Sequence, residues 1–302
     1  MMNYEEFKDA MLKKADEDLG EQYGKASIKP IVKPNYNDFY ISFENIKVGL
    51  IIPLMKLYHI YCNFNKYDST EMVYSLFKNT FLEMMEDQLK EIEHFNDYIN
   101  SMDLDLSCVH LRIFNTDMNK NFLSELPHIV FKDLVAFFYF TKDDKTILIT
   151  NVMCEKWGLD SDTLYKHAKE NQIALNGISI SPIKDMIASF EGEDNEEYEE
   201  YDTGMYVLTN EHYCYGSGYI LFPEVLDNIC DAIRENNPCN NFYIFPSSVH
   251  DLIVMPANDN DNICAIKAMI KVVNDEHVSS EEFLSNSFYT YDYTSKEVSI
   301  LE

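Results

Sequence analysis

The 302-residue chain is poor in positive charge: 24 Lys and Arg stand against 52 Asp and Glu, which leaves a formal charge of −28. A conventional nucleic-acid-binding protein gathers Lys and Arg to neutralise phosphates, so direct nucleic-acid binding is not expected. The chain also has only nine glycines and no phosphate-binding loop, which leaves little backbone suited to surround a nucleotide. We therefore predict no cofactor.

Long apolar runs are missing as well. The longest, Val48–Met55 and Leu134–Phe140, fall far short of the roughly 20 residues that a membrane-spanning helix needs. The first residues carry acids where a signal peptide requires a basic segment. Seven scattered cysteines without a Cys-x-x-Cys motif are typical of reduced thiols. These features predict a cytoplasmic protein without a membrane span.

Core-forming residues are plentiful, because 46% of the chain is hydrophobic and 14% is aromatic. The periodicity predicts an α+β fold, mainly antiparallel sheets with packed helices. Helical spacing over residues 3–19 ends at Gly20, and a long amphipathic helix follows Asp68 with apolar residues from Val73 to Ile99. Strands are expected at 39–43, 46–52, 205–209 and 213–221, among others.

The acidic segment 191–202 holds eight acids in twelve positions and no basic residue. Mutual repulsion between these carboxylates predicts an extended linker. The chain is accordingly divided into an N-terminal α+β region with the long helix (1–104), a hairpin-plus-helices region (105–190), the acidic linker (191–204) and a C-terminal α+β unit (205–302).

An ordered string of short motifs runs through the chain. It comprises Pro127-His128, Phe131-x-Asp133-Leu134, Ile149-Thr150-Asn151, Trp157-Gly158, Ala168, Leu208-Thr209-Asn210, Tyr215-Gly216, Phe222-Pro223, Pro246-Ser247-Ser248-Val249-His250-Asp251 and Val272-Val273-Asn274. This string resembles an uncharacterised bacterial family, a domain of unknown function found in gut anaerobes and their mobile elements. The chain differs from the pattern of this family at Ile129, where Arg is expected, and at Asp251, where Glu is usual. It implies a fold and a genomic setting, and it supplies no activity.

The segment Ser247-Ser248-Val249-His250-Asp251 brings a nucleophile, a base and an acid close together in sequence. A hydrolase or transferase that uses Ser247 or Ser248 with His250 and Asp251 is the alternative function. In an extended strand Ser248 and His250 share a face with their Cβ atoms roughly 7 Å apart, so a tight turn would have to bring them into contact. The competing interpretation is structural: the serines bind turn amides and His250 binds a backbone carbonyl.

Metal-binding patterns are incomplete. Glu91-x-x-His94 has the spacing of a di-iron ligand pair, but such sites need a second helical copy. Cys108 and His110 alternate on one predicted strand, without another Cys/His pair at ligand spacing. We interpret them as a buried thiol and a histidine whose hydrogen bonds are satisfied, and we predict no metal site.

The strongest functional signal is therefore the charge. We predict a non-catalytic interaction protein, a mobile-element accessory or an inhibitor of a nucleic-acid-processing enzyme that mimics the charge of DNA for a protein partner with a basic groove. Solubility alone is the competing explanation of the charge. The sequence does not determine the oligomeric state. The candidate binding residues lie on the long helix and on the helix that begins at Pro223: Glu83, Glu86, Asp87, Glu93, Asp97, Glu224, Asp227, Asp231 and Glu235.

Overall fold

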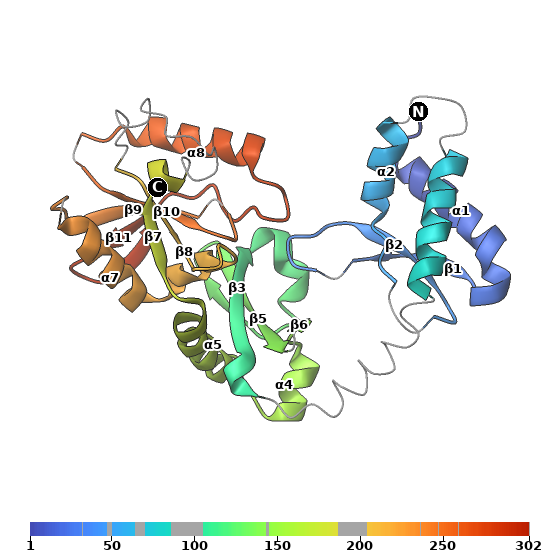
Figure 1. Ribbon diagram of the computed structural model, residues 1–302, viewed down its shortest axis with the longest axis horizontal. Coiled ribbons are helices and arrows are strands. Elements are labelled where there is room, and N and C mark those ends of the chain that lie inside the picture. Colours follow the sequence, from blue (N-terminus) through green and yellow to red (C-terminus); the bar gives the residue numbers. More distant parts are fainter. Residues whose placement is uncertain are drawn as a thin grey trace. The chain divides into compact units, whose positions relative to one another are not determined.

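A computed structural model describes residues 1–31, 33–46, 50–63, 70–85, 105–142, 145–186, 204–235, 237–246, 248–258 and 260–301. The chain folds into two compact units, Met1–Asp103 (unit 1) and Leu104–Glu302 (unit 2), each described by itself (Figure 1). The predicted α+β class is confirmed, because antiparallel sheets pack with helices in both units. In the described residues, no helix is long and apolar enough to cross a membrane.

Unit 1 begins with helix α1 (Tyr4–Tyr23), whose capping box joins the side chains of Asn3 and Glu6 to each other's backbone N–H groups. The predicted end at Gly20 is wrong, because the helix continues to Gly24. Gly24 has a φ of 85°, a conformation that glycine adopts without steric cost, whereas a glycine inside a helix costs only about 1 kcal/mol.

A two-stranded antiparallel sheet of β1 (Ala26–Pro30) and β2 (Phe39–Phe43) follows, then α2 (Leu54–Asn63) and a helical stretch over residues 70–85. Of the predicted strand 46–52, residues 46 and 50–52 belong to no strand, and 47–49 lie outside the described residues. The sequence analysis also missed α2. Its start is stabilised by the buried Asp38 carboxylate, which accepts the Met55 N–H at 3.1 Å.

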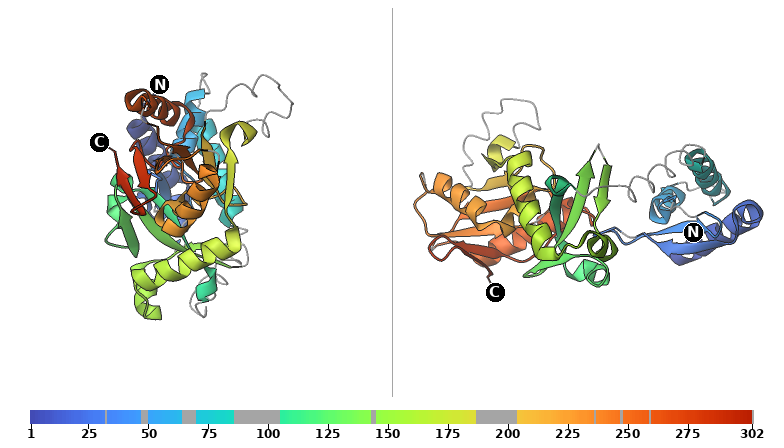
Figure 2. Two further views of the ribbon diagram at one scale, coloured as in Figure 1. Left: turned by 90° about the vertical axis from the view of Figure 1, so that its left-hand side faces the viewer. Right: turned by 90° about the horizontal axis from the view of Figure 1, so that it is seen from below.

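Unit 2 contains two sheets. In the first, β5 (Leu134–Lys142) pairs with β3 (Val109–Asn115), with β4 (His128–Phe131) and with β6 (Lys145–Leu148), all antiparallel. The central β5 is buried from Leu134 to Phe140. Helices α4 (Asn151–Trp157) and α5 (Ser161–Asn176) follow, and α5 packs along β3 (Figure 2).

The second sheet of unit 2 has six antiparallel strands. Their spatial order is β12 (Glu297–Ile300), β11 (Tyr289–Asp292), β9 (Asn241–Phe245), β10 (Leu252–Pro256), β8 (Tyr206–Thr209) and β7 (Ser179–Pro182). Helices α7 (Pro223–Arg234) and α8 (Ile263–His277) complete the unit. Because β7 pairs with β8, this sheet takes strands from both sides of the predicted linker 191–204, of which 191–203 lie outside the described residues.

The two sheets of unit 2 are joined through Asp133, which directly precedes β5. Its carboxylate accepts hydrogen bonds from the hydroxyls of Ser285, Ser287 and Tyr289. The Asn115 side chain of β3 also donates to the Leu284 carbonyl at 2.6 Å. Buried polar groups are thus paired where the two sheets meet, as a stable interior requires.

The predicted strand 213–221 is wrong. Residues Gly216–Leu221 form the 3₁₀ helix η4, and the chain before it is a tight loop. The Asn210 side chain closes this loop by accepting the N–H groups of His212 and Cys214. The backbone at Tyr213 and Tyr215 is left-handed, with φ of 53° and 58°, so the segment cannot run extended.

Candidate functional site

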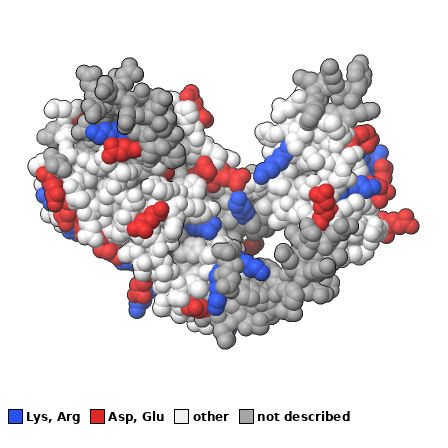
Figure 3. Space-filling model, in the orientation of Figure 1, with Lys and Arg blue, Asp and Glu red and all other residues white. Residues whose placement is uncertain are grey.

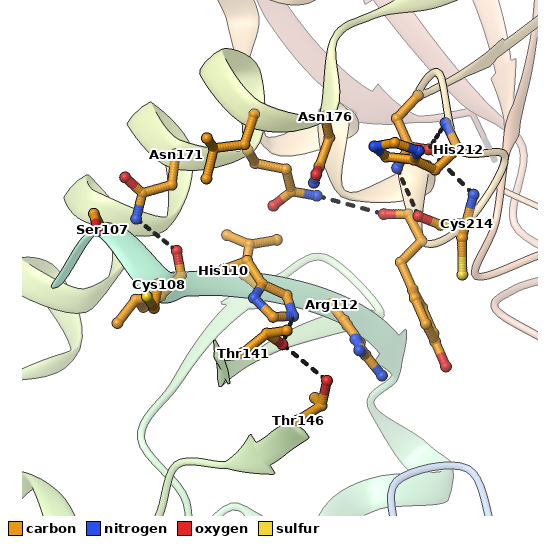
Figure 4. A pocket seen from close by; sticks show the side chains of 16 residues that line it. Ser107, Cys108, His110, Arg112, Thr141, Thr146, Asn171, Asn176, His212 and Cys214 are labelled. Carbon is orange, nitrogen blue, oxygen red and sulfur yellow. Dashed lines mark hydrogen bonds between the residues drawn. The ribbon is translucent and has the colours of Figure 1, made fainter. Parts of the chain in front are cut away.

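A cavity of about 340 Å³ lies in unit 2 along the edge strand β3, between α5 and the loop 210–215 (Figure 4). The lining residues are Ser107, Cys108, Val109, His110, Leu111, Arg112, Thr141, Thr146, Asn171, Gln172, Leu175, Asn176, Asn210, His212, Cys214 and Tyr215. None of these residues is Asp or Glu, although acids make up 52 of the 302 positions. The cavity wall is therefore neutral apart from one permanent cation, Arg112.

Arg112 projects from β3 beside two tyrosine rings. Its guanidinium carbon lies 4.3 Å from the ring centre of Tyr139 on β5 and 3.8 Å from that of Tyr215 in the loop. Its Nε atom is buried without a hydrogen-bond partner, and within the described part of the chain no carboxylate pairs with the guanidinium. The tyrosines hold the charge by cation–π contact, and the buried Nε has no acceptor among the described residues.

His110 lies two residues before Arg112 and points to the same side of β3, toward Thr141 and Thr146 (Figure 4). Burial, with a smaller effect of the neighbouring Arg112 charge, lowers the pKa of His110 to about 4. The ring is consequently neutral at pH 7. Its Nε2 lies 3.4 Å from the Thr141 hydroxyl, which is 2.8 Å from that of Thr146.

Helix α5 supplies two amides to the opposite wall. Asn171 donates to the carbonyls of Leu106 and Val109, both at 2.7 Å, and so fixes β3 against the helix. Gln172 is 2% exposed, and its Nε2 donates to the Tyr215 carbonyl at 3.4 Å. Its Oε1 is buried and has no hydrogen-bond partner among the described residues. The cavity wall therefore contains an unpaired acceptor as well as a cation.

His250 supports the loop that carries Tyr215. The Tyr215 N–H donates to His250 Nδ1 at 3.3 Å, and the His250 carbonyl accepts the Gly216 N–H and the Thr209 hydroxyl at 2.9 and 2.8 Å. The rings of His250 and Tyr215 lie 5.2 Å apart. Thr209, Gly216 and His250, which belong to three separate motifs of the string, thus contact one another beside Tyr215, whose ring lies against Arg112.

The serine–histidine segment has a different geometry from that of an activated nucleophile. Ser248 Oγ accepts the His250 backbone N–H at 2.9 Å, while His250 Nε2 lies 3.6 Å from a Glu282 carboxylate oxygen. Burial raises the pKa of the Asp251 carboxyl, and Ser247 lies outside the described residues. These contacts are those of a turn that supports the loop, and the hydrolase or transferase hypothesis stays a prediction.

The acids proposed for partner binding are only partly described. Glu86, Asp87, Glu93 and Asp97 lie outside the described residues, and Glu83 and Glu235 are exposed. The other three have partners: Glu224 pairs with Lys169, Asp227 with Lys296 and the Tyr291 hydroxyl, and Asp231 with the Tyr293 hydroxyl. On the face drawn in Figure 3, acidic and basic side chains are interspersed.

Cys108 was interpreted as a buried thiol and His110 as a hydrogen-bonded histidine. Both line the cavity, where Cys108 is half-buried and His110 lies beside the Thr141 hydroxyl. The sequence analysis missed Arg112, Tyr139, Gln172 and Tyr215 as site residues. One signal was available: the chain has only two arginines, Arg112 and Arg234. In the described residues there is no cluster of His, Cys, Asp and Glu placed to hold a metal ion.

The fold and the cavity define an α+β protein whose second unit carries a ligand-sized, largely neutral cavity with one arginine. The chain belongs to the Family of unknown function (DUF5688), whose family model matches residues 4–293. The predicted membership of a family of unknown function is thereby confirmed. No curated protein and no solved structure was found to match the chain.

Proposed function

We propose that unit 2 binds a small anionic molecule in the cavity along β3 and that Arg112 is the residue that binds the anion. The observation that carries the proposal is the Arg112 guanidinium, which lies against two tyrosine rings without a described carboxylate partner in a chain of charge −28. Arg112 is only partly exposed, and the hydration that a cation loses on partial burial costs free energy unless an anion or acceptor compensates it. A bound anion supplies that compensation.

The two tyrosine rings also restrict how the anion approaches. Because two rings lie against the guanidinium carbon, we expect a ligand to approach along the N–H groups of the guanidinium. An anion that meets two of these N–H groups accepts two parallel hydrogen bonds, which is the strongest arrangement that arginine makes. Lysine in the same place would offer a point charge without this geometry.

Titration of acetate and of inorganic phosphate, followed by NMR, tests the proposal. Arg112→Gln should weaken binding at least tenfold, since it removes the charge and keeps a polar side chain of related shape. Arg234→Gln is the matched control: Arg234 also stacks on a tyrosine, Tyr293 at 4.1 Å, and also has a buried, unpaired Nε, but it does not line the cavity. Equal binding by wild type and Arg112→Gln, or no binding of either anion by the folded protein, would overturn it.

We propose, second, that the acidic exterior recognises a basic protein partner, in the setting of a mobile-element accessory or inhibitor, in the cytoplasm of a gut anaerobe. The observation in its favour is the net charge of −28, with Glu83 and Glu235 exposed. An excess of one charge steers an oppositely charged partner toward the protein.

A further inference from the structure

We infer that the ligand of the cavity is a small carboxylate whose other end carries a neutral N–H or O–H donor. The inference rests on the proposed anion binding by Arg112 and adds the chemical class. It comes from the juxtaposition, in one cavity, of the Arg112 cation, the unpaired Gln172 oxygen and a wall free of acids.

The inference that the ligand carries a hydrogen-bond donor rests on Gln172. This side chain is 2% exposed, and its Oε1 has no partner among the described residues. A buried acceptor without a partner costs about 1–3 kcal/mol, which a ligand hydroxyl or amide N–H recovers. A ligand with an acceptor at that end would instead meet the oxygen with like partial charge.

The donor must be neutral. An ammonium group in the cavity would lose its water and find none of the lining residues able to provide a negative charge, while Arg112 repels it. Free amino acids and amines are therefore disfavoured relative to hydroxy acids and N-acylated acids.

The anion is a carboxylate because a single positive charge is present. Phosphate monoesters carry about −1.5 to −2 charges at neutral pH and call for more than one cation. His110, two residues before Arg112 on β3, is uncharged at pH 7 and adds none. A carboxylate matches one guanidinium edge in both charge and planar shape.

Arg112 on β3 contacts the Tyr215 ring, whereas Gln172 on α5 contacts the Tyr215 carbonyl, so several bonds must separate the two ends of the ligand. The cavity volume of about 340 Å³ is near the lower end of ligand pockets, which hold roughly 300–1,000 Å³. A flexible chain of about five carbons with a carboxylate and a terminal hydroxyl is a suitable probe.

The experiment compares five probes on the full chain by ligand-observed NMR: 5-hydroxypentanoate, pentanoate, 5-aminopentanoate, 5-hydroxypentanamide and inorganic phosphate. The first four differ only in the donor or in the charge. We expect 5-hydroxypentanoate to bind at least tenfold more tightly than each of the others. In Gln172→Met, 5-hydroxypentanoate should bind less than twofold more tightly than pentanoate. Arg112→Gln should weaken the binding of both 5-hydroxypentanoate and pentanoate. Arg234→Gln should leave the binding of both unchanged.

Arg112-dependent binding of pentanoate or phosphate as tight as that of 5-hydroxypentanoate would overturn the ligand class and leave anion binding intact. Preference for 5-aminopentanoate would also overturn the class. Absence of Arg112-dependent binding for every probe would overturn both proposals. The five probes on the wild-type protein suffice for this decision if Gln172→Met does not fold.

Discussion

Two regions of unit 2 differ in whether their charged and polar groups have partners within the described residues. Where α7 meets β11 and β12, the Asp227 carboxylate has the Lys296 ammonium and the Tyr291 hydroxyl as partners, and Asp231 has the Tyr293 hydroxyl. In the cavity, Arg112 and the Gln172 oxygen lack such partners among the described residues. The first region is a completed network that stabilises the fold, whereas the second has hydrogen-bonding and charge capacity left for a ligand.

Tyrosine makes the completed region possible in a chain with few cations. The hydroxyls of Tyr4, Tyr74, Tyr289, Tyr291 and Tyr293 each donate to an aspartate. A hydroxyl can occupy a buried position without the desolvation cost of an ammonium group. With 21 tyrosines against 24 Lys and Arg, the chain supplies five aspartates with tyrosine hydroxyl donors, and two of these aspartates also have a lysine partner.

The largest effect should come from the loop that carries Tyr215. In Gly216→Ala the new Cβ would lie 2.6–2.7 Å from atoms of Thr209 and Asn210, two of them in the backbone, so the loop must shift. We expect a loss of about 3 kcal/mol of unfolding free energy, measured with urea. Gly158→Ala is the control: it has nothing within 4 Å and only its left-handed φ of 67°, so about 1 kcal/mol is expected. Equal losses would show that close packing does not define this loop.

The next effect tests the completed region. Asp227→Ala leaves the Tyr291 hydroxyl, in a residue of 0% exposure, without its acceptor, and should cost about 2 kcal/mol of unfolding free energy. Arg112→Gln should cost less than about 1 kcal/mol, because it removes a partly exposed cation that makes only ring contacts. If Arg112→Gln proves the more destabilising of the two in urea unfolding, Arg112 is a structural residue and the comparison fails.

The pH dependence of stability should reveal the cavity histidine. The pKa of His110 is about 4 in the folded chain, below the ordinary value of 6.5. Between pH 6.5 and 4, His110 is therefore protonated in the unfolded chain and neutral in the folded chain. Stability is then greatest above pH 6.5 and falls by about 3 kcal/mol as the pH drops to 4, because each unit of pKa difference corresponds to about 1.4 kcal/mol. Urea unfolding of His110→Gln should lack this contribution, and the difference between the two proteins isolates it. Parallel profiles from pH 7 to 4 would contradict the burial of His110.

The smallest effect concerns the acidic exterior. If a basic partner binds there, Glu83→Gln combined with Glu235→Gln should weaken the complex only severalfold, because each exposed ion pair contributes about 0.2–1 kcal/mol. Raising the salt concentration from 0.1 to 1 M should weaken it further, since the Debye length falls from about 10 to about 3 Å. A partner captured from a host lysate at low salt would be used for surface plasmon resonance, which measures both effects. A binding affinity that does not change with salt would exclude charge mimicry.

Local patterns predicted the elements that depend on near neighbours. Strands were expected at 39–43 and 205–209 and a helix from Pro223, and the structure has β2, β8 and α7 at these places. Caps, prolines and apolar periodicity act within one or two helical turns, so their effect can be predicted from the sequence alone. The errors at Gly20 and at residues 213–221 arose where the backbone angle of Gly24 and the side chain of Asn210 decided the outcome.

The candidate site was less accessible to sequence reasoning, because its parts are far apart in the chain. Arg112 comes from β3, Tyr139 from β5, Gln172 from α5 and Tyr215 from a loop held by His250. The sequence by itself determined the α+β class, the excess of carboxylates and the scarcity of arginine. The tertiary structure alone decided that Arg112 lies against Tyr139 and Tyr215 without a described carboxylate partner, since strand register and loop closure bring residues distant in sequence together.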